Sequence, residues 1–180
     1  MKFMSKLQKK RDELKKDNNG FSLVELIIVI AIMAILVGIV GTQVIPYINK
    51  SKQSKDQQLA NSYSTAAVSA YSMLAGELSN ANDSYAIDVY ADKLGTDDKG
   101  KLAAKIVELT GYEEFSNLQS KFSSKDAKDT TKTTKILVTI NATDDEVDMT
   151  VSTSETVKVP AHSVRVEIPG SGVKGVSAEL

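Results

Sequence analysis

The sequence predicts an α+β protein in which a long N-terminal helix packs on a C-terminal antiparallel β-sheet of about four strands. Three patterns in the 180 residues support this fold class. A charge-free apolar run extends from Leu26 to Val44, an apolar stripe with helical spacing lies between Leu59 and Leu74, and β-branched residues alternate after residue 135. The first two patterns predict one long helix, and the third predicts strands.

The chain begins with a basic segment that continues into a stretch long enough to cross a membrane. Residues 1–20 carry seven basic and three acidic side chains, a net charge of +4. The nineteen uncharged residues from Leu26 to Val44 would span roughly 29 Å as a helix, close to the ~30 Å hydrocarbon core of a bilayer. Basic residues before such a segment stay in the cytoplasm. We therefore expect a single-pass precursor in the cytoplasmic membrane, with its N-terminus in the cytoplasm and the bulk of the chain exported.

Glu25 is the most informative residue of this part, because it precedes the apolar run by one position. A carboxylate in or near a bilayer costs at least a few kcal/mol, so such residues are rare and are usually paired. An ordinary secretory signal has a shorter apolar region followed by a cleavage site of small residues, which residues 40–43 do not provide. A cut after Gly20 would instead free the amine of Phe21 and leave the apolar helix on the mature chain. A plain signal-anchor helix with an isolated glutamate is the alternative.

Gly20, Phe21 and Glu25, set between the basic leader and the apolar run, resemble the precursor motif of type IV pilins and secretion-system pseudopilins. The resemblance implies that a prepilin peptidase cuts between Gly20 and Phe21 and methylates the Phe21 amine. It implies that Glu25 pairs with the N-terminal amine of a neighbouring subunit in a helical homo-oligomer. A cytoplasmic assembly ATPase and a platform membrane protein are further implied partners. Many Gram-negative pilins contain a disulfide, so the absence of cysteine here favours a Gram-positive source.

Five segments are predicted along the chain. They are a cleaved leader (1–20), a transmembrane and filament-core helix (21–46), its amphipathic continuation (47–75), a variable helix and loop region (76–134), and the sheet with a C-terminal tail (135–180). Pro46 predicts a bend near the end of the apolar segment, at a position that stays open because many pilins carry their proline where this chain has Thr42. The polar stretch 49–56, with three lysines, is predicted to be an outer membrane-proximal surface or a subunit contact.

The helical spacing in the amphipathic continuation predicts a stripe that covers the protein's own sheet. Its members are Leu59, Tyr63, Ala66, Ala67, Ala70, Tyr71 and Leu74. In the variable region, Asn80–Ser84 is expected to be a polar break, residues 102–109 a short helix ended by Gly111, and residues 115–122 a further helical turn. Residues 123–135, rich in Ser, Thr, Lys and Asp, are expected to form a solvated loop.

The last third predicts four half-buried strands in an antiparallel meander, because apolar residues alternate and the connections are short. The alternating residues are Ile136, Val138 and Ile140; Val147, Met149 and Val151; Val157 and Val159; and Val164, Val166 and Ile168. Residues 169–180 are expected to form a loop-like tail.

No catalytic or metal site and no cofactor are predicted. The single histidine, His162, lies beside Pro160 in an expected turn and has no visible triad. The acidic groups at residues 97–98 and 144–146 do not match a calcium loop. Asn82 and Asn141 begin N-glycosylation triplets, to which no modification is assigned. After loss of the leader the side chains carry 15 basic and 20 acidic residues, a net charge of −5, which argues against nucleic acid as a main partner.

The sequence therefore predicts a non-enzymatic structural subunit. By resemblance it is the major pilin of a type IV pilus, an extracellular surface filament for adhesion, motility or aggregation. A minor pilin or a pseudopilin is the first alternative, because all three share the N-terminal motif. A monomeric membrane-anchored binding module is the second, and a tethered enzyme is a third.

Overall fold

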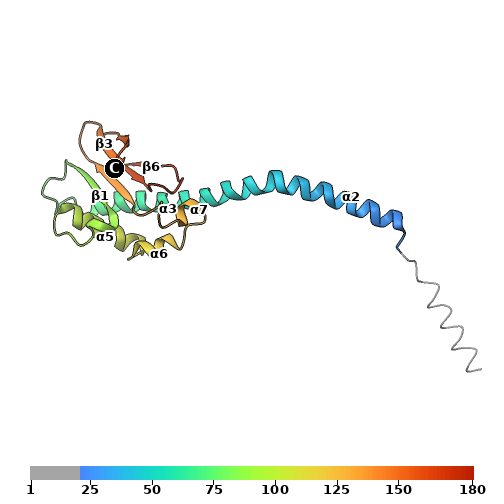
Figure 1. Cartoon of the computed structure of the whole chain (residues 1–180). Helices are drawn as coiled ribbons and strands as arrows, with labels where there is room; N and C mark the ends of the chain where they lie inside the picture. Colours follow the sequence, from blue (N-terminus) through green and yellow to red (C-terminus); the bar gives the residue numbers. More distant parts are fainter. Residues whose placement is uncertain (1–20) are drawn as a thin grey trace, which may run out of the picture. The chain divides into compact units, whose positions relative to one another are not determined.

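A computed structural model describes residues 21–180, so the expected leader and Gly20 lie outside the described residues. The described chain combines helices with antiparallel strands, which confirms the α+β prediction (Figure 1). The elements are α2 (Leu23–Ile39), the π-helical turn η1 (Val40–Val44), α3 (Ile45–Leu74), β1 (Ser84–Asp88), α4 (Val89–Asp92), α5 (Asp98–Thr110), α6 (Phe115–Gln119), α7 (Lys125–Lys128), β2 (Leu137–Asn141), β3 (Val147–Ser152), β4 (Glu155–Val159), β5 (Ser163–Glu167) and β6 (Val176–Glu179).

The chain divides into two units, an N-terminal unit that ends at Tyr47 and a second unit, here called the head, from Ile48 to Leu180. The N-terminal unit contains α2, η1 and the first residues of α3. Its apolar residues occur on every side of the helix and none of its described side chains is buried. The head contains the remainder of α3 and every strand.

A departure from a regular α-helix occurs at η1, which ends two residues before Pro46. Proline has no N–H to donate, and its ring crowds the carbonyl four residues earlier, which belongs to Thr42. A π-helical turn widens the backbone at that point; such turns are rare and occur mostly as single turns inside α-helices. The hydroxyl of Thr42 donates to the carbonyls of Gly38 and Ile39, at 3.1 and 3.3 Å. The structure thus places the predicted irregularity at residues 40–44, one turn ahead of the proline.

The main sheet of the head has the strand order β1-β2-β5-β6, with all neighbours antiparallel. Val138 and Ile140 of β2 lie opposite Val166 and Val164 of β5, so four β-branched side chains share one buried face. The amphipathic part of α3 covers this face. In Figure 1 the sheet, α3 and the short helices α5 to α7 lie together in this unit.

The stripe predicted along α3 is confirmed by burial. Tyr63, Ala67 and Ala70 have no exposed surface and Ala66 has almost none, while Leu59, Tyr71 and Leu74 are half-buried against the same core. Small alanines allow the helix to approach the sheet closely, and the larger side chains fill the edges. The core is completed by residues of α4, α5, α6, the strands and the segments that connect them, among them Ile87, Val89, Leu102, Ala103, Ile106, Leu118, Phe122 and Ile136.

The predicted meander is wrong in its pairing. β3 and β4 form a separate two-stranded hairpin, while β2 pairs directly with β5, and the outer strands of the main sheet are β1 and β6. The hairpin has its own small apolar cluster of Met149, Val151 and Val159, with Leu137 of β2 packed against it. Alternation shows which residues of a strand face a core, but it does not say which core or which neighbouring strand.

The elements between residues 76 and 135 are partly as predicted. α5 and its end at Gly111 are confirmed, since Gly111 adopts a left-handed conformation with φ of 75° and closes the helix. α6 is also confirmed. The loop expected at residues 123–135 is wrong, because it contains α7 and buries Ser124, Ala127 and Thr133. The sequence also predicted neither β1, at the end of the expected polar break, nor β6, in the expected tail.

Candidate functional site

The N-terminal end of α2 is organised by Glu25. Ser22 is extended and precedes the first helical residue, and one carboxylate oxygen of Glu25 accepts a hydrogen bond from the Ser22 N–H at 3.1 Å. This contact satisfies one of the backbone donors that a helix start leaves free. Phe21 is 80% exposed and lies one residue before this cap. The structure thus brings Phe21 and Glu25 to one helix end, while Gly20 lies outside the described residues.

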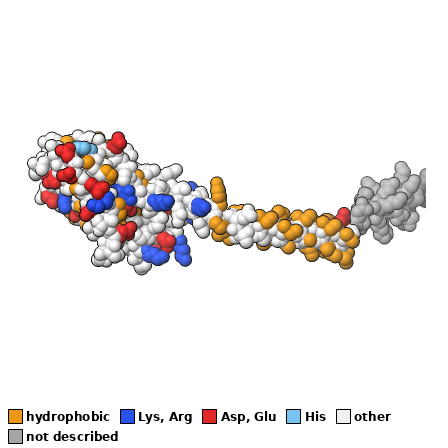
Figure 2. All heavy atoms as spheres, turned by 90° about the horizontal axis from the view of Figure 1, so that it is seen from above, with side chains coloured by type: hydrophobic (Ala, Val, Ile, Leu, Met, Phe, Trp, Pro, Cys, Tyr) orange, Lys and Arg blue, Asp and Glu red, His pale blue; other side chains and the backbone are white. Residues whose placement is uncertain are grey.

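The surface of α2 after Glu25 is apolar on every side and exposed, and η1 continues it without a charged side chain. Figure 2 shows orange hydrophobic side chains along the visible face of this helix. Large side chains such as Ile30, Met33 and Leu36 are more than half exposed. Among the described residues, one helix is long and apolar enough to cross a membrane, and its most apolar window has no buried residue. A helix that is hydrophobic on all sides needs an apolar environment, which lipid or other apolar helices can supply.

Asp56 is a structural carboxylate that the sequence analysis missed. The polar stretch 49–56 is predicted to be an outer membrane-proximal surface or a subunit contact, but Asp56 has no exposed area within the head. Its two oxygens accept hydrogen bonds from the backbone N–H groups of Ser123 and Ser124, at 2.6 and 2.8 Å. These bonds join α3 to the segment that begins α7. The partners are backbone groups 67 and 68 residues away, so no side-chain pattern in the sequence announces them.

A tyrosine cluster lies between α3 and α4 in the head. The hydroxyls of Tyr63 and Tyr90 are 2.6 Å apart, and the Tyr90 hydroxyl donates to the carbonyl of Tyr112 at 3.1 Å. Burial raises the pKa of Tyr63 and, more strongly, that of Tyr90, because the charged phenolate would lose its hydration. Both hydroxyls therefore serve as neutral hydrogen-bonding groups of the core.

No catalytic constellation is formed by the described residues. His162 is exposed in a turn with φ of 48°, as expected, and its ring Nε2 lies 3.0 Å from Asp144 Oδ1. In residues 21–180, no group of three or more His, Cys, Asp or Glu side chains is arranged to hold a metal ion. Asp97 acts as the N-cap of α5, where its side chain accepts from the Gly100 N–H at 2.9 Å. This acidic position is thus explained by local structure.

Asn141 is fully buried and is not available for a glycan. Its amide nitrogen donates to the carbonyls of Asp145, Val159 and Pro160, at 2.8, 3.2 and 2.9 Å. Its side-chain oxygen accepts from both the N–H and the hydroxyl of Thr143. Every hydrogen-bonding position of the amide nitrogen is therefore used to hold the base of the β3–β4 hairpin.

Comparison with known proteins identifies one shared feature, at the N-terminus. Residues 15–41 match the family model described as the prokaryotic N-terminal methylation motif. This segment contains the predicted cleavage position, Phe21, Glu25 and most of the apolar helix. No curated protein and no solved structure matches the chain. The motif and the exposed apolar helix together support a type IV pilin-like or pseudopilin-like prepilin that is anchored in a membrane before processing.

Proposed function

We propose that the chain is the major structural subunit of a type IV pilus. The observation that carries this proposal is the exposed apolar helix with a single carboxylate at its N-terminal end, inside the matched methylation motif. In a soluble monomer this apolar surface would be exposed to water, whereas a polymer can bury it between subunits. The head would coat the filament and provide adhesion, motility or aggregation contacts.

The proposed sequence of events begins in the cytoplasmic membrane. The apolar helix anchors the precursor, and residues beyond about Tyr47 lie on the outer side of the membrane. A prepilin peptidase cuts between Gly20 and Phe21 and methylates the new amine, as the motif implies. An assembly ATPase and a platform membrane protein, the partners that the pilin resemblance implies, then draw the subunit from the bilayer.

In this proposal Glu25 pairs with the Phe21 amine of a neighbouring subunit. One oxygen of its carboxylate already accepts the Ser22 N–H. An ionised carboxylate has two oxygens and about four lone-pair positions, so it can cap its own helix and accept an ammonium at the same time. Opposite charges attract far more strongly among apolar helices than in water, which makes the pair a selective guide for the incoming helix.

Burial of the apolar surface drives the rest of assembly. Helices that were solvated by lipid would pack against other copies along the filament axis. Each subunit would contact its neighbours through different faces, and such heterologous contacts give an open helical filament when the rotation does not close. The same helix would thus serve first as the membrane anchor and then as the polymer core.

The first test is intact-mass spectrometry on filaments sheared from the surface of the native host. A dominant species that begins at methylated Phe21 is the expected result for a major pilin. The same species in trace amounts would identify a minor pilin or a pseudopilin. An uncleaved chain that begins at Met1 and occurs only in membranes would reject the filament proposal in favour of an anchored binding module.

A second test separates the charge of Glu25 from its capping role. Glu25→Gln keeps an oxygen that can accept the Ser22 N–H but removes the negative charge, whereas Glu25→Ala removes both. We expect both variants to be processed and neither to enter filaments, while Glu113→Ala, at an exposed head position, assembles normally. Filament entry by Glu25→Gln at the wild-type level would show that the charge pair is not required.

A further inference from the structure

We propose that the end of the head at which α3 enters it binds the anionic headgroups of phospholipids in the outer leaflet before assembly. The surface consists of Lys50, Lys52, Lys55, Lys125 and Lys174, here called the basic collar. This inference rests on the membrane-anchored precursor of the proposed function. It adds a ligand class and a surface that the N-terminal motif does not imply.

The positions of the first three lysines follow from the helix itself. Lys50, Lys52 and Lys55 lie in the first three turns of α3 and are exposed. They follow Val44, the last residue of the charge-free run, by 6, 8 and 11 positions. At about 1.5 Å per residue, Lys50 lies roughly 9 Å beyond the run, where the ~5–8 Å headgroup layer of a leaflet ends. A lysine chain can reach back along the helix into that layer.

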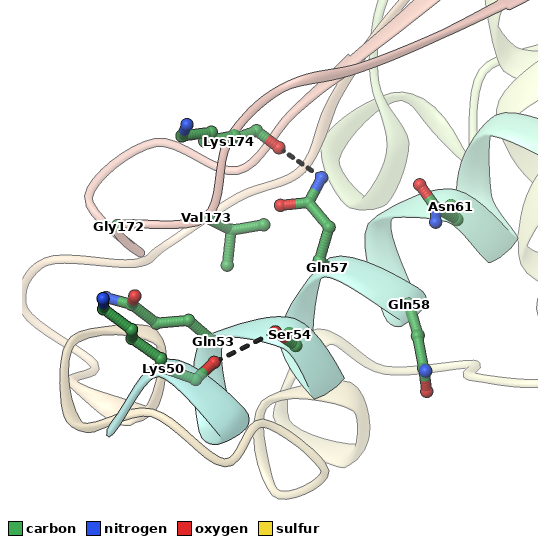
Figure 3. Close-up of a pocket in the computed structure, with 9 residues that line it drawn as sticks. All are labelled: Lys50, Gln53, Ser54, Gln57, Gln58, Asn61, Gly172, Val173 and Lys174. Atoms are coloured by element: carbon green, nitrogen blue, oxygen red, sulfur yellow. Dashed lines mark hydrogen bonds between the residues drawn. The ribbon is translucent and has the colours of Figure 1, made fainter. Parts of the chain in front are cut away.

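Lys125 and Lys174 complete the collar from two other segments. A groove of about 410 Å³ lies beside the first turns of α3, and Figure 3 shows Lys50 and Lys174 among the residues that line it. The Gln57 amide donates to the Lys174 carbonyl at 2.8 Å, which fixes this part of the chain on α3. A second hollow joins Lys52 to Lys125 at the start of α7. Gln53 lines both hollows, so the lysines surround the same part of the helix.

The collar lysines are not neutralised by the protein. Within the described part of the chain, none of the five ammonium groups forms an ion pair, whereas Lys93, Lys101, Lys105, Lys132 and Lys158 elsewhere in the head do. The two acidic groups closest in sequence are already engaged. Asp56 is buried and bound to backbone N–H groups, and Asp126 pairs with Lys132 at 2.7 Å.

Charge complementarity selects the partner. The groove beside α3 is lined by lysines, amides, a serine, Gly172 and Val173, with no carboxylate among its lining residues. Anionic phosphates suit such a surface, and each lysine near an anionic membrane strengthens binding about fivefold. A second copy of the chain, which has acidic groups such as residues 144–146 in its head, is the competing partner. The lipid surface is favoured because Lys50, Lys52 and Lys55 follow the apolar run within a few residues, at the distance of the headgroups.

The test uses the full-length precursor, one copy per nanodisc, in phosphatidylglycerol or in phosphatidylcholine alone. Lysine accessibility is measured by reductive methylation with formaldehyde and dimethylamine–borane, both uncharged reagents, followed by peptide mass spectrometry. We expect the collar lysines to react about fivefold more slowly in the anionic disc and this protection to disappear at high salt. Lys99, which is exposed and forms no ion pair among the described residues, is the internal control and should react equally in both lipids.

Two double variants distinguish headgroup binding from slower lysine methylation caused only by the lower pH at an anionic surface. Lys125→Gln combined with Lys174→Gln should partly release Lys50 and Lys52 in the anionic disc, because the remaining lysines bind less tightly. Lys99→Gln combined with Lys135→Gln should leave their protection unchanged. Equal reactivity in both lipids, protection that survives the first double variant, or protection that appears only with several copies per disc would each overturn the proposal. A chain that fails to insert through its apolar helix would instead count against the proposed function.

Discussion

Replacing Asp56 should destabilise the head far more than its place in a lysine-rich polar stretch suggests. Its carboxylate accepts two backbone N–H groups from a fully buried position. Asp56→Ala leaves both donors without a partner, and each unsatisfied buried donor costs about 1–3 kcal/mol. We expect Asp56→Ala to lower the free energy of unfolding by about 3 kcal/mol. This value allows for the hydration that the aspartate carboxylate loses when it is buried, a cost that alanine does not have. Asp56→Asn should lose about 2 kcal/mol, because its amide offers one acceptor and places a donor against the other N–H.

The measurement is urea unfolding of the full chain in detergent, with the near-ultraviolet circular dichroism of the head tyrosines as the signal. Asp126→Ala is the matched control, since Asp126 is an exposed aspartate whose carboxylate contacts Lys132 at 2.7 Å. An exposed ion pair contributes at most about 1 kcal/mol. If Asp56→Ala lost no more stability than Asp126→Ala, the attribution of that stability to the two backbone hydrogen bonds would be refuted.

Three further predictions concern the head. Asn141→Ala should lower the free energy of unfolding by about 2–3 kcal/mol, and it should speed amide hydrogen exchange in β3 and β4 but not in the main sheet. An equal increase of exchange across the whole head would contradict the anchoring role of Asn141. Stability should fall as the pH rises above about 10, because burial raises the pKa of the Tyr63 and Tyr90 hydroxyls in the folded head. In that pH range the unfolded chain releases the two hydroxyl protons and the folded chain keeps them, which favours unfolding. Tyr90→Phe should weaken this pH dependence in alkaline unfolding curves. Gly170→Ala should lower the thermal midpoint, since φ is 76° and a Cβ would clash with the Lys132 carbonyl oxygen. An unchanged midpoint would show that the backbone relaxes to accept the added methyl group.

The sequence was most informative where structure is determined locally. The Tyr63 stripe follows from helical spacing alone, because burial of one face of a helix leaves a period of 3.6 residues. Gly111 was identified as a helix end because a left-handed residue there favours glycine. Glu25 was singled out by its position against the apolar run, and the structure adds that it caps Ser22. Each of these features depends on residues within a few turns of one another.

The features that were missed depend on distant backbone partners. Asp56 looks solvent-exposed in sequence because its partners are N–H groups, which every residue except proline carries. β6 has no fully buried side chain, so its alternation is weak, and β1 shows only Tyr85 and Ile87 as apolar inward-facing residues. The base of the separate hairpin is held by the buried amide of Asn141, and the sequence does not reveal this role because an asparagine beside Thr143 and Asp144 predicts an exposed turn.

The β3–β4 hairpin is joined to the rest of the head at its base, through the Asn141 amide and the contact of Leu137 with the hairpin cluster. β3 and β4 pair only with each other and bury a small cluster of their own, so their outward-facing residues carry little of the main core. Substitutions or insertions at the tip, around residues 153–154, would leave Asn141 and the four-stranded sheet intact. The tip of the hairpin can therefore accept changes of sequence and length while the pairing of the main sheet is preserved.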